Sequence, residues 1–65
     1  MKVLLWQARQ SRSITLVELA KRTGVSKSTL NNIENYRTSP TLIQLERIAV
    51  ALNCRITDLF DSEYK

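Results

Sequence analysis

The stretch Leu16–Asn35 constrains the fold more than any other part of this 65-residue chain. A small residue, Ala20, lies four places before Gly24, which is the only glycine in the sequence. Ala20 allows two helix backbones to approach closely, and Gly24 can adopt the left-handed conformation that a Cβ penalises by about 1 kcal/mol or more. Hydrophobic residues follow the glycine at Val25, Leu30 and Ile33. This pattern predicts two short helices that cross steeply through a tight turn.

The second of these helices has an outer face that the pattern leaves free of hydrophobic residues. Helix pairs of this kind can place such a face in the major groove of DNA. The net charge of the chain is +4, and residues 1–37 carry seven cations against two carboxylates, a net charge of +5. A polyanion would be drawn to this half of the chain. The same charges could instead serve only to keep the surface solvated.

Hydrophobic spacing and capping residues predict an all-α chain of five helices. The helices are expected at Lys2–Ser11, Leu16–Thr23, Lys27–Asn35 and Leu42–Leu52, with a short fifth helix that Thr57 caps and that ends near Phe60. Thr15 and Glu18 have the spacing of a capping box before the second helix. Thr41 and Gln44 repeat that spacing before the fourth helix, and Ser26 can cap the third.

One hydrophobic core is expected between these helices, and no segment alternates over the length of a strand. The first helix would contribute Met1, Leu4, Leu5 and Ala8, the second Leu19 with Val17, and the fourth Leu42, Leu45, Ile48, Ala49 and Leu52. Residues 1–65 are therefore interpreted as a single domain, in which residues 61–65 form a frayed polar tail.

Several classes of protein are disfavoured by what the sequence lacks. A single cysteine and no histidine leave no ligand set for zinc and no internal disulfide. No apolar run approaches the roughly 18 residues that cross a membrane, and the N-terminus does not have the pattern of a signal peptide. We therefore expect a cytoplasmic protein with no metal, cofactor or small-molecule ligand. No nucleophile with a base is evident, so an enzyme is not expected.

The whole series of residues resembles the lambda-repressor-like (Cro/cI, XRE) helix-turn-helix family. The family's spacing is carried by Leu19-Ala20, Gly24-Val25-Ser26, Leu30, Ile33-Glu34-Asn35, Ser39-Pro40, Leu45, Ile48-Ala49, Ala51-Leu52 and Asp58-Leu59. The resemblance implies a five-helix DNA-binding domain with its helix-turn-helix at the second and third helices. It also implies a homodimer that binds a palindromic operator in double-stranded DNA.

In this family the first turn of the third helix meets the edges of the bases. The resemblance transfers base contacts to Lys27, Ser28, Thr29 and Asn32, and phosphate contacts to Thr15, Leu16, Ser26, Asn35, Tyr36, Arg37 and Thr38. Lysine can donate to guanine, asparagine can bind adenine, and the threonine methyl can contact thymine. Ser26 could instead only cap the helix, and Lys27 could reach only phosphate.

Ala20 and Gly24 are assigned structural roles, and the resemblance adds a pair between the first and third helices. Arg9 and Glu34 match positions that often form an ion pair in relatives, and we expect a partly buried bridge that fixes the third helix. The alternative is two solvated charges.

Two positions depart from the family's pattern. Leu16 replaces a glutamine, so its side chain cannot bond a phosphate, although its backbone amide can. Tyr36 replaces a glycine, and a bulky residue is an outlier at positive φ, so a different turn is expected there. Tyr36 could lie on the sugar-phosphate backbone or form an aromatic lid over the fourth helix.

These observations lead to a sequence-specific regulator of transcription, a repressor that inserts the third helix in the major groove. The alternative belongs to another class: a protein-interaction module, an antitoxin-like or anti-repressor partner, built on the same scaffold. An acidic outer face on the third helix would favour that alternative, whereas Lys27 and the basic first half disfavour it.

Overall fold

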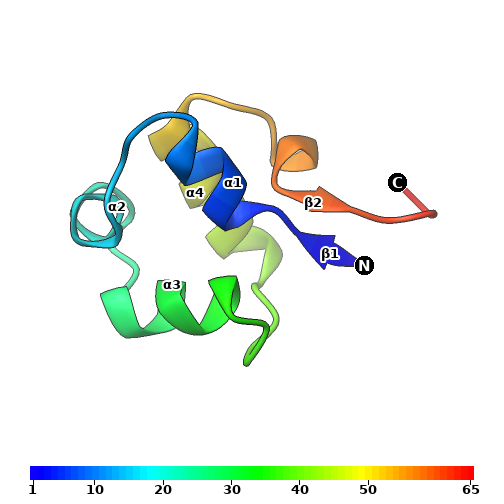
Figure 1. Ribbon diagram of the computed structural model, residues 1–65, viewed down its shortest axis with the longest axis horizontal. Helices are drawn as coiled ribbons and strands as arrows, with labels where there is room; N and C mark the ends of the chain where they lie inside the picture. Colours follow the sequence, from blue (N-terminus) through cyan, green and yellow to red (C-terminus); the bar gives the residue numbers. More distant parts are fainter.

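The computed structural model describes residues 1–65 as four α-helices, one 3-10 turn and a ribbon of two short strands (Figure 1). The elements in chain order are β1 Lys2–Val3, α1 Leu5–Gln10, α2 Leu16–Thr23, α3 Lys27–Glu34, α4 Leu42–Leu52, η1 Ile56–Asp58 and β2 Phe60–Asp61. The bounds of α2 and α4 are as the sequence predicts. In Figure 1 α2 is seen end-on and α3 lengthwise, so these two helices cross steeply.

The prediction of five helices is wrong, because the ends of the chain pair with each other. Val3 lies opposite Phe60 in the antiparallel β1–β2 ribbon, and the Leu4 amide donates to the Leu59 carbonyl at 2.8 Å. These bonds take residues 2–4 out of the predicted first helix. The fifth helix is only the single turn η1, which the Asp58 carboxylate closes by accepting from the Arg55 amide at 2.9 Å. Thr57 therefore does not cap it.

The residues after β2 form a turn. The Lys65 amide donates to the Ser62 carbonyl at 3.2 Å, and the Lys65 ammonium donates to the Phe60 carbonyl at 2.9 Å. These bonds hold the last four residues in a turn beside β2.

Side-chain caps begin α2, α3 and α4, as the sequence predicts. Thr41 and Gln44 form a complete capping box at α4. At α2 only half of the predicted box is present: the Thr15 hydroxyl accepts from the Glu18 amide at 3.1 Å. The Glu18 carboxylate accepts from Arg22 at 2.6 Å instead of returning to the cap. The ion pair one turn away therefore replaces the second bond of the box.

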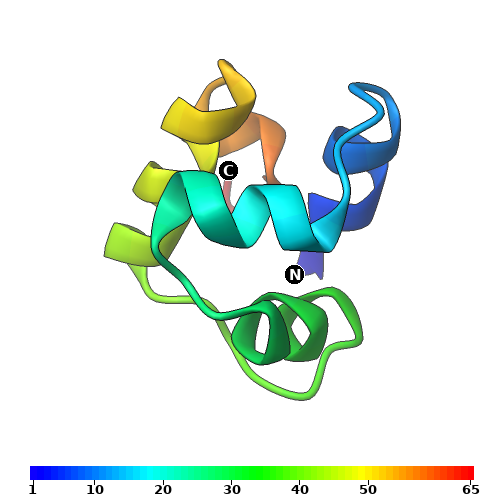
Figure 2. The same cartoon turned by 90° about the vertical axis from the view of Figure 1, so that its left-hand side faces the viewer.

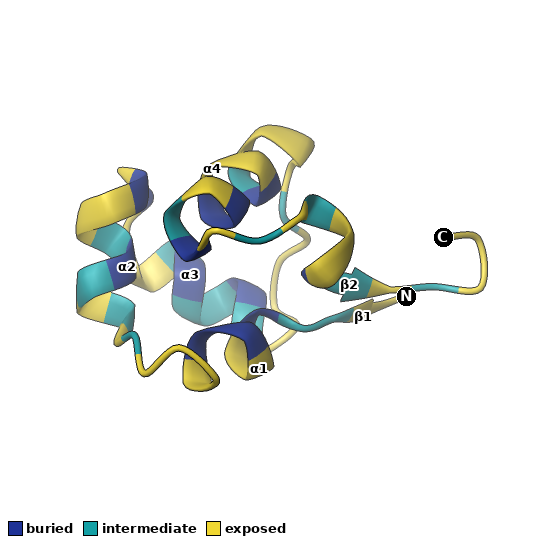
Figure 3. Ribbon diagram, turned by 90° about the horizontal axis from the view of Figure 1, so that it is seen from above, coloured by how far each residue is buried: buried dark blue, intermediate teal, exposed yellow.

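The core lies between the four helices, and Figure 3 shows their buried positions facing inward. It consists of Leu5, Ala8, Leu19, Val25, Leu30, Ile33, Leu45, Ile48, Ala49, Leu52 and Leu59. Met1 and Leu42 are each 77% exposed, so their prediction as core residues is wrong. Met1 precedes a strand rather than standing on a helix, and Leu42 begins α4 on its outer side. Val17 is also exposed.

Candidate nucleic-acid interface

The turn between α2 and α3 sets the direction in which α3 leaves the core. Gly24 has φ +73°, and its amide donates to the Ala20 carbonyl at 3.0 Å. The Thr23 hydroxyl accepts from the Val25 amide at 3.1 Å, which holds the chain as it leaves the turn. Ser26 then caps α3 by accepting from the Thr29 amide at 3.1 Å. These bonds satisfy the backbone amides of Gly24, Val25 and Thr29.

The inner face of α3 is anchored by apolar packing and by an ion pair. Leu30 and Ile33 are almost fully buried. On the same side, the Arg9 Nε donates to Glu34 Oε1 at 2.7 Å and its Nη2 to Oε2 at 3.2 Å. The side chains of Arg9 and Glu34 are only 10% and 6% exposed, and Arg9 Nη1 also donates to the Ile14 carbonyl at 3.0 Å. The expected bridge is therefore present, and it joins α1 to α3 with two parallel bonds.

The outer face of α3 carries the residues to which base contacts were assigned. Lys27 and Ser28 are exposed, and Thr29 and Asn32 are half-buried. Ser28 and Asn32 are four residues apart and so lie on one face of the helix. Lys27 takes part in neither ion pair of the chain. The Ser26 hydroxyl donates to Thr29 Oγ1 at 2.8 Å, so both hydrogen-bonding functions of Ser26 are used inside the chain.

One polar residue on this helix was missed by the sequence analysis. The Asn35 Nδ2 donates to the Asn31 carbonyl at 2.8 Å and to Asn31 Oδ1 at 3.1 Å. The Asn31 side chain therefore has its oxygen occupied and its amide nitrogen free to donate. Its spacing of four residues from Lys27 was the signal in the sequence, because residues at that distance share a side of the helix.

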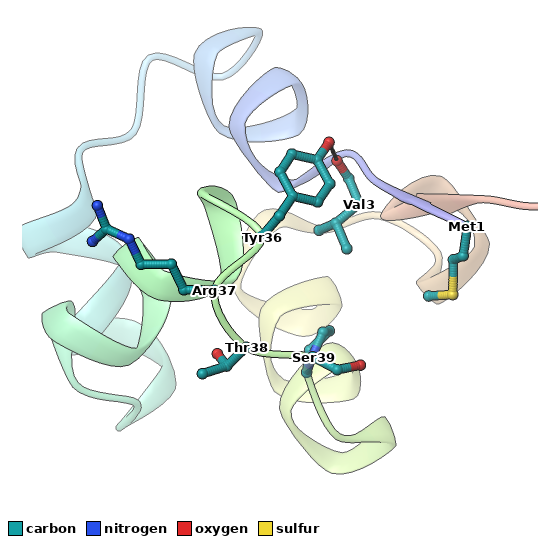
Figure 4. A pocket seen from close by; sticks show the side chains of 7 residues that line it. Met1, Val3, Tyr36, Arg37, Thr38 and Ser39 are labelled. Carbon is teal, nitrogen blue, oxygen red and sulfur yellow. Dashed lines mark hydrogen bonds between the residues drawn. The ribbon is translucent and has the colours of Figure 1, made fainter.

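The turn after α3 is the left-handed turn in which relatives have glycine. The expectation that Tyr36 would form a different turn is therefore wrong. Tyr36 has φ +61°; its amide donates to the Ile33 carbonyl at 3.2 Å, and the Arg37 amide donates to the Asn32 carbonyl at 2.9 Å. This pair of bonds is the Schellman arrangement that usually contains glycine. Tyrosine is accommodated because its hydroxyl donates to the Val3 carbonyl of β1 at 3.0 Å (Figure 4).

The same contact decides against an aromatic lid over α4. Figure 4 shows the Tyr36 side chain directed at Val3. Tyr36 as a whole is 60% exposed. A shallow hollow of about 230 Å³ lies beside it and is lined by Met1, Val3, Tyr36, Arg37, Thr38, Ser39 and Pro40. Arg37 and Thr38 are exposed, and the Arg37 side chain points away from β1.

The cations of residues 1–37 divide into those used inside the chain and those left free. Arg9 is in the bridge to Glu34, and Arg22 pairs with Glu18. Arg12 Nε donates to the Leu52 carbonyl at 2.8 Å and its Nη1 to the Ala8 carbonyl at 2.9 Å. Lys27 and Arg37, which bracket α3, take part in no ion pair. Lys2 and Lys21 are also unpaired, so two of the four cations left for a ligand in this half of the chain lie at the two ends of α3.

Phosphate contacts were also assigned to two residues at the beginning of α2, Thr15 and Leu16. Thr15 is exposed, and its side-chain oxygen accepts from the Glu18 amide as the cap. Leu16 is half-buried and packs against the core, which accounts for a leucine there. The first amides of a helix attract anions because they have no partner within the helix.

We also searched the structure for a metal site, a membrane-spanning helix and a reactive thiol. No three His, Cys, Asp or Glu side chains are grouped as metal ligands would be. No helix has both the length and the apolar character needed to cross a bilayer. Partial burial raises the pKa of the Cys54 thiol, and the nearby Arg12 guanidinium opposes this shift. A raised pKa leaves less of the reactive thiolate at neutral pH.

Comparison with known proteins gives consistent matches. The helix-turn-helix family model HTH_3 matches residues 7–59. The transcriptional regulator SutR of Escherichia coli is 49% identical over 49 residues, which cover 75% of this chain and 28% of SutR. The regulator SinR of Bacillus subtilis is 35% identical over 60 residues, which cover 91% of this chain and 54% of SinR. The chain thus spans about half the length of these relatives, or less.

The fold agrees with a solved structure as well. The N-terminal DNA-binding domain of SinR from Bacillus subtilis superimposes with a TM-score of 0.78 at 34% identity. The match covers 94% of this chain and 90% of that domain.

Proposed function

The chain belongs to the helix-turn-helix family, and we propose that it is a sequence-specific regulator of transcription that inserts α3 in the major groove of double-stranded DNA. One observation carries the proposal. The outer face of α3 is polar and lies between two cations without an ion-pair partner, Lys27 and Arg37, while the opposite face is fixed by the buried Arg9–Glu34 bridge. Rigid support and an unoccupied polar face are what recognition of base edges requires.

In this proposal Lys27, Ser28, Thr29 and Asn32 contact bases. Lys27 can donate to guanine O6 and N7, and Asn32 can pair with adenine N6 and N7. Each such contact discriminates against a wrong base by about 1–3 kcal/mol. Asn31, beside Lys27, offers only its amide nitrogen, so we add it as a donor to an acceptor on the base or the phosphate.

Phosphates are contacted by the residues on both sides of α3. These are Thr15, Leu16, Ser26, Asn35, Tyr36, Arg37 and Thr38. For Leu16 and Ser26 the backbone amides would serve, since the Ser26 hydroxyl already donates to Thr29. The Thr15 hydroxyl accepts from the Glu18 amide and keeps its hydrogen to donate to a phosphate. Such contacts set the position on the duplex and carry no sequence information.

We further propose that two copies bind a palindromic operator and that occupancy of the site represses transcription. The two α3 helices would then lie about 34 Å apart, one turn of DNA. SutR and SinR are regulators by name, which supports regulation as the role of this chain. In this role residues 1–65 act as one DNA-binding domain, without catalytic activity.

The test is selection of bound duplexes from a random pool, followed by sequencing. We expect a two-fold-symmetric site, and Lys27→Ala with Asn32→Ala should weaken binding to it by about 2–4 kcal/mol in total. Arg55→Ala removes one positive charge at η1, far from α3, and should bind almost as the parent does. Absence of any enriched sequence would contradict the proposal.

A further inference from the structure

The outer side of α4 carries apolar residues that the core does not use. Ile43 is 65% exposed, and Val50 is 77% exposed. Glu46 and Arg47 lie between them and are also exposed. Positions separated by three, four and seven residues share one face of a helix, so these four side chains form a single stripe, which we call the α4 stripe. Neither Glu46 nor Arg47 forms an ion pair within the chain.

Along α4 the stripe has an apolar residue, two residues of opposite charge and a second apolar residue. The same order of apolar and charged positions is found when the helix is followed in the opposite direction. A two-fold axis between Glu46 and Arg47 brings Ile43 of one copy opposite Val50 of the other. The same operation brings each Glu46 opposite an Arg47. A parallel arrangement would instead place each charge beside its like. The stripe is therefore complementary, in both apolar character and charge, to an antiparallel copy of itself.

We propose that the α4 stripe is a self-association surface, on which α4 of a second copy packs in the antiparallel direction. A hollow of about 210 Å³ beside Val50 supports this arrangement, since it lies where Ile43 of the second copy would enter. The hollow is lined by Arg22, Thr23, Glu46, Arg47 and Val50. The contact removes Ile43 and Val50 from water in both copies and pairs all four charges.

The direction of α4 gives this association a consequence for DNA, which rests on the proposed function. In Figure 2 α4 begins near α3 and extends away from it. An axis perpendicular to α4 therefore places the two α3 helices at opposite ends of the pair. Self-association would therefore bring two DNA-binding helices into one assembly.

The first experiment measures self-association by sedimentation of the full chain without DNA, up to about 1 mM. Arg47→Glu creates two Glu–Glu contacts and should weaken association at least about tenfold, and Glu46→Arg should do the same. The double variant Glu46→Arg/Arg47→Glu restores both pairs and should recover association. Arg55→Glu makes the same change in charge elsewhere and should have no effect. A monomeric parent chain, or a double variant that does not recover, would overturn the proposal.

The second experiment tests the antiparallel register. Cys54→Ser chains carrying either Ile43→Cys or Val50→Cys are mixed and treated with a short bismaleimide. Random pairing of an equimolar mixture gives the mixed product twice the yield of either product of one chain with itself, so the antiparallel register should give a ratio well above two. A ratio of two or less would overturn the register. The Lys27→Ala/Asn32→Ala variant should associate normally, so failure of DNA binding and failure of this surface are distinguishable. If α4 binds a different protein instead, neither charge reversal nor mixing would produce these patterns.

Discussion

The two turns that bound α3 have nearly the same backbone conformation but opposite causes. Gly24 precedes the helix at φ +73°, and Tyr36 follows it at φ +61°. Glycine adopts this conformation freely, and an added Cβ at Gly24 would meet nothing within 4 Å. Tyrosine adopts it at a cost, which its bond to Val3 offsets. The first turn is set by a residue's own preference, and the second by contacts with distant parts of the chain.

The largest effect should come from the contact that anchors α3 near its second turn. Glu34→Ala leaves the buried Arg9 guanidinium without its carboxylate, and we expect the free energy of unfolding to fall by about 3 kcal/mol. Urea denaturation followed by circular dichroism measures this loss. The exposed Glu63→Ala is a matched control and should change stability by less than about 0.5 kcal/mol. Equal effects of the two variants would show that the bridge does not anchor α3.

A smaller effect is expected at the first turn. Gly24→Ala should cost about 1 kcal/mol, because the left-handed backbone alone opposes the methyl group and no neighbouring atom does. Thermal melts of both proteins give the difference. A loss of several kcal/mol would mean that this turn, like the second, depends on distant contacts.

The smallest effect should come from the hydroxyl at the second turn. Tyr36→Phe removes the bond to the Val3 carbonyl and keeps the ring, so we expect a loss of about 0.5–1 kcal/mol. Amide hydrogen exchange at Arg37, whose N–H donates to Asn32, should become faster in this variant. If stability and exchange did not change, the hydrogen bond to Val3 would not be what offsets the cost of the left-handed backbone at Tyr36.

The same division explains which parts of the fold the sequence could predict. The bounds of α2 and α4 follow from caps and hydrophobic spacing that lie within the elements themselves. The β1–β2 ribbon could not be predicted, because a strand of two residues is too short to show an alternation of apolar and polar residues. Its strands form only when residues 60 and 61 are brought beside residues 2 and 3. The shortened fifth helix depends on one carboxylate, Asp58, that the capping argument assigned no role.

For the site, spacing on α3 was enough to select exposed polar positions. Lys27, Ser28 and Asn32 are all at least partly accessible, although their contacts with DNA stay predictions. The bond between Asn31 and Asn35 was missed because a family resemblance names positions and gives no information about which amide atoms are already occupied. Tyr36 was misjudged because its partner, Val3, is 33 positions away in sequence.

The internal use of Arg9, Arg12 and Arg22 limits how many condensed counterions a duplex would release when the chain binds. Residues 1–37 hold seven cations, but three of them already bond to oxygens of the protein itself. Only Lys2, Lys21, Lys27 and Arg37 remain for phosphates from this half. These four residues should therefore contribute no more than about −4 to the slope of log affinity against log salt for each copy, well below what a tally of all seven cations would give.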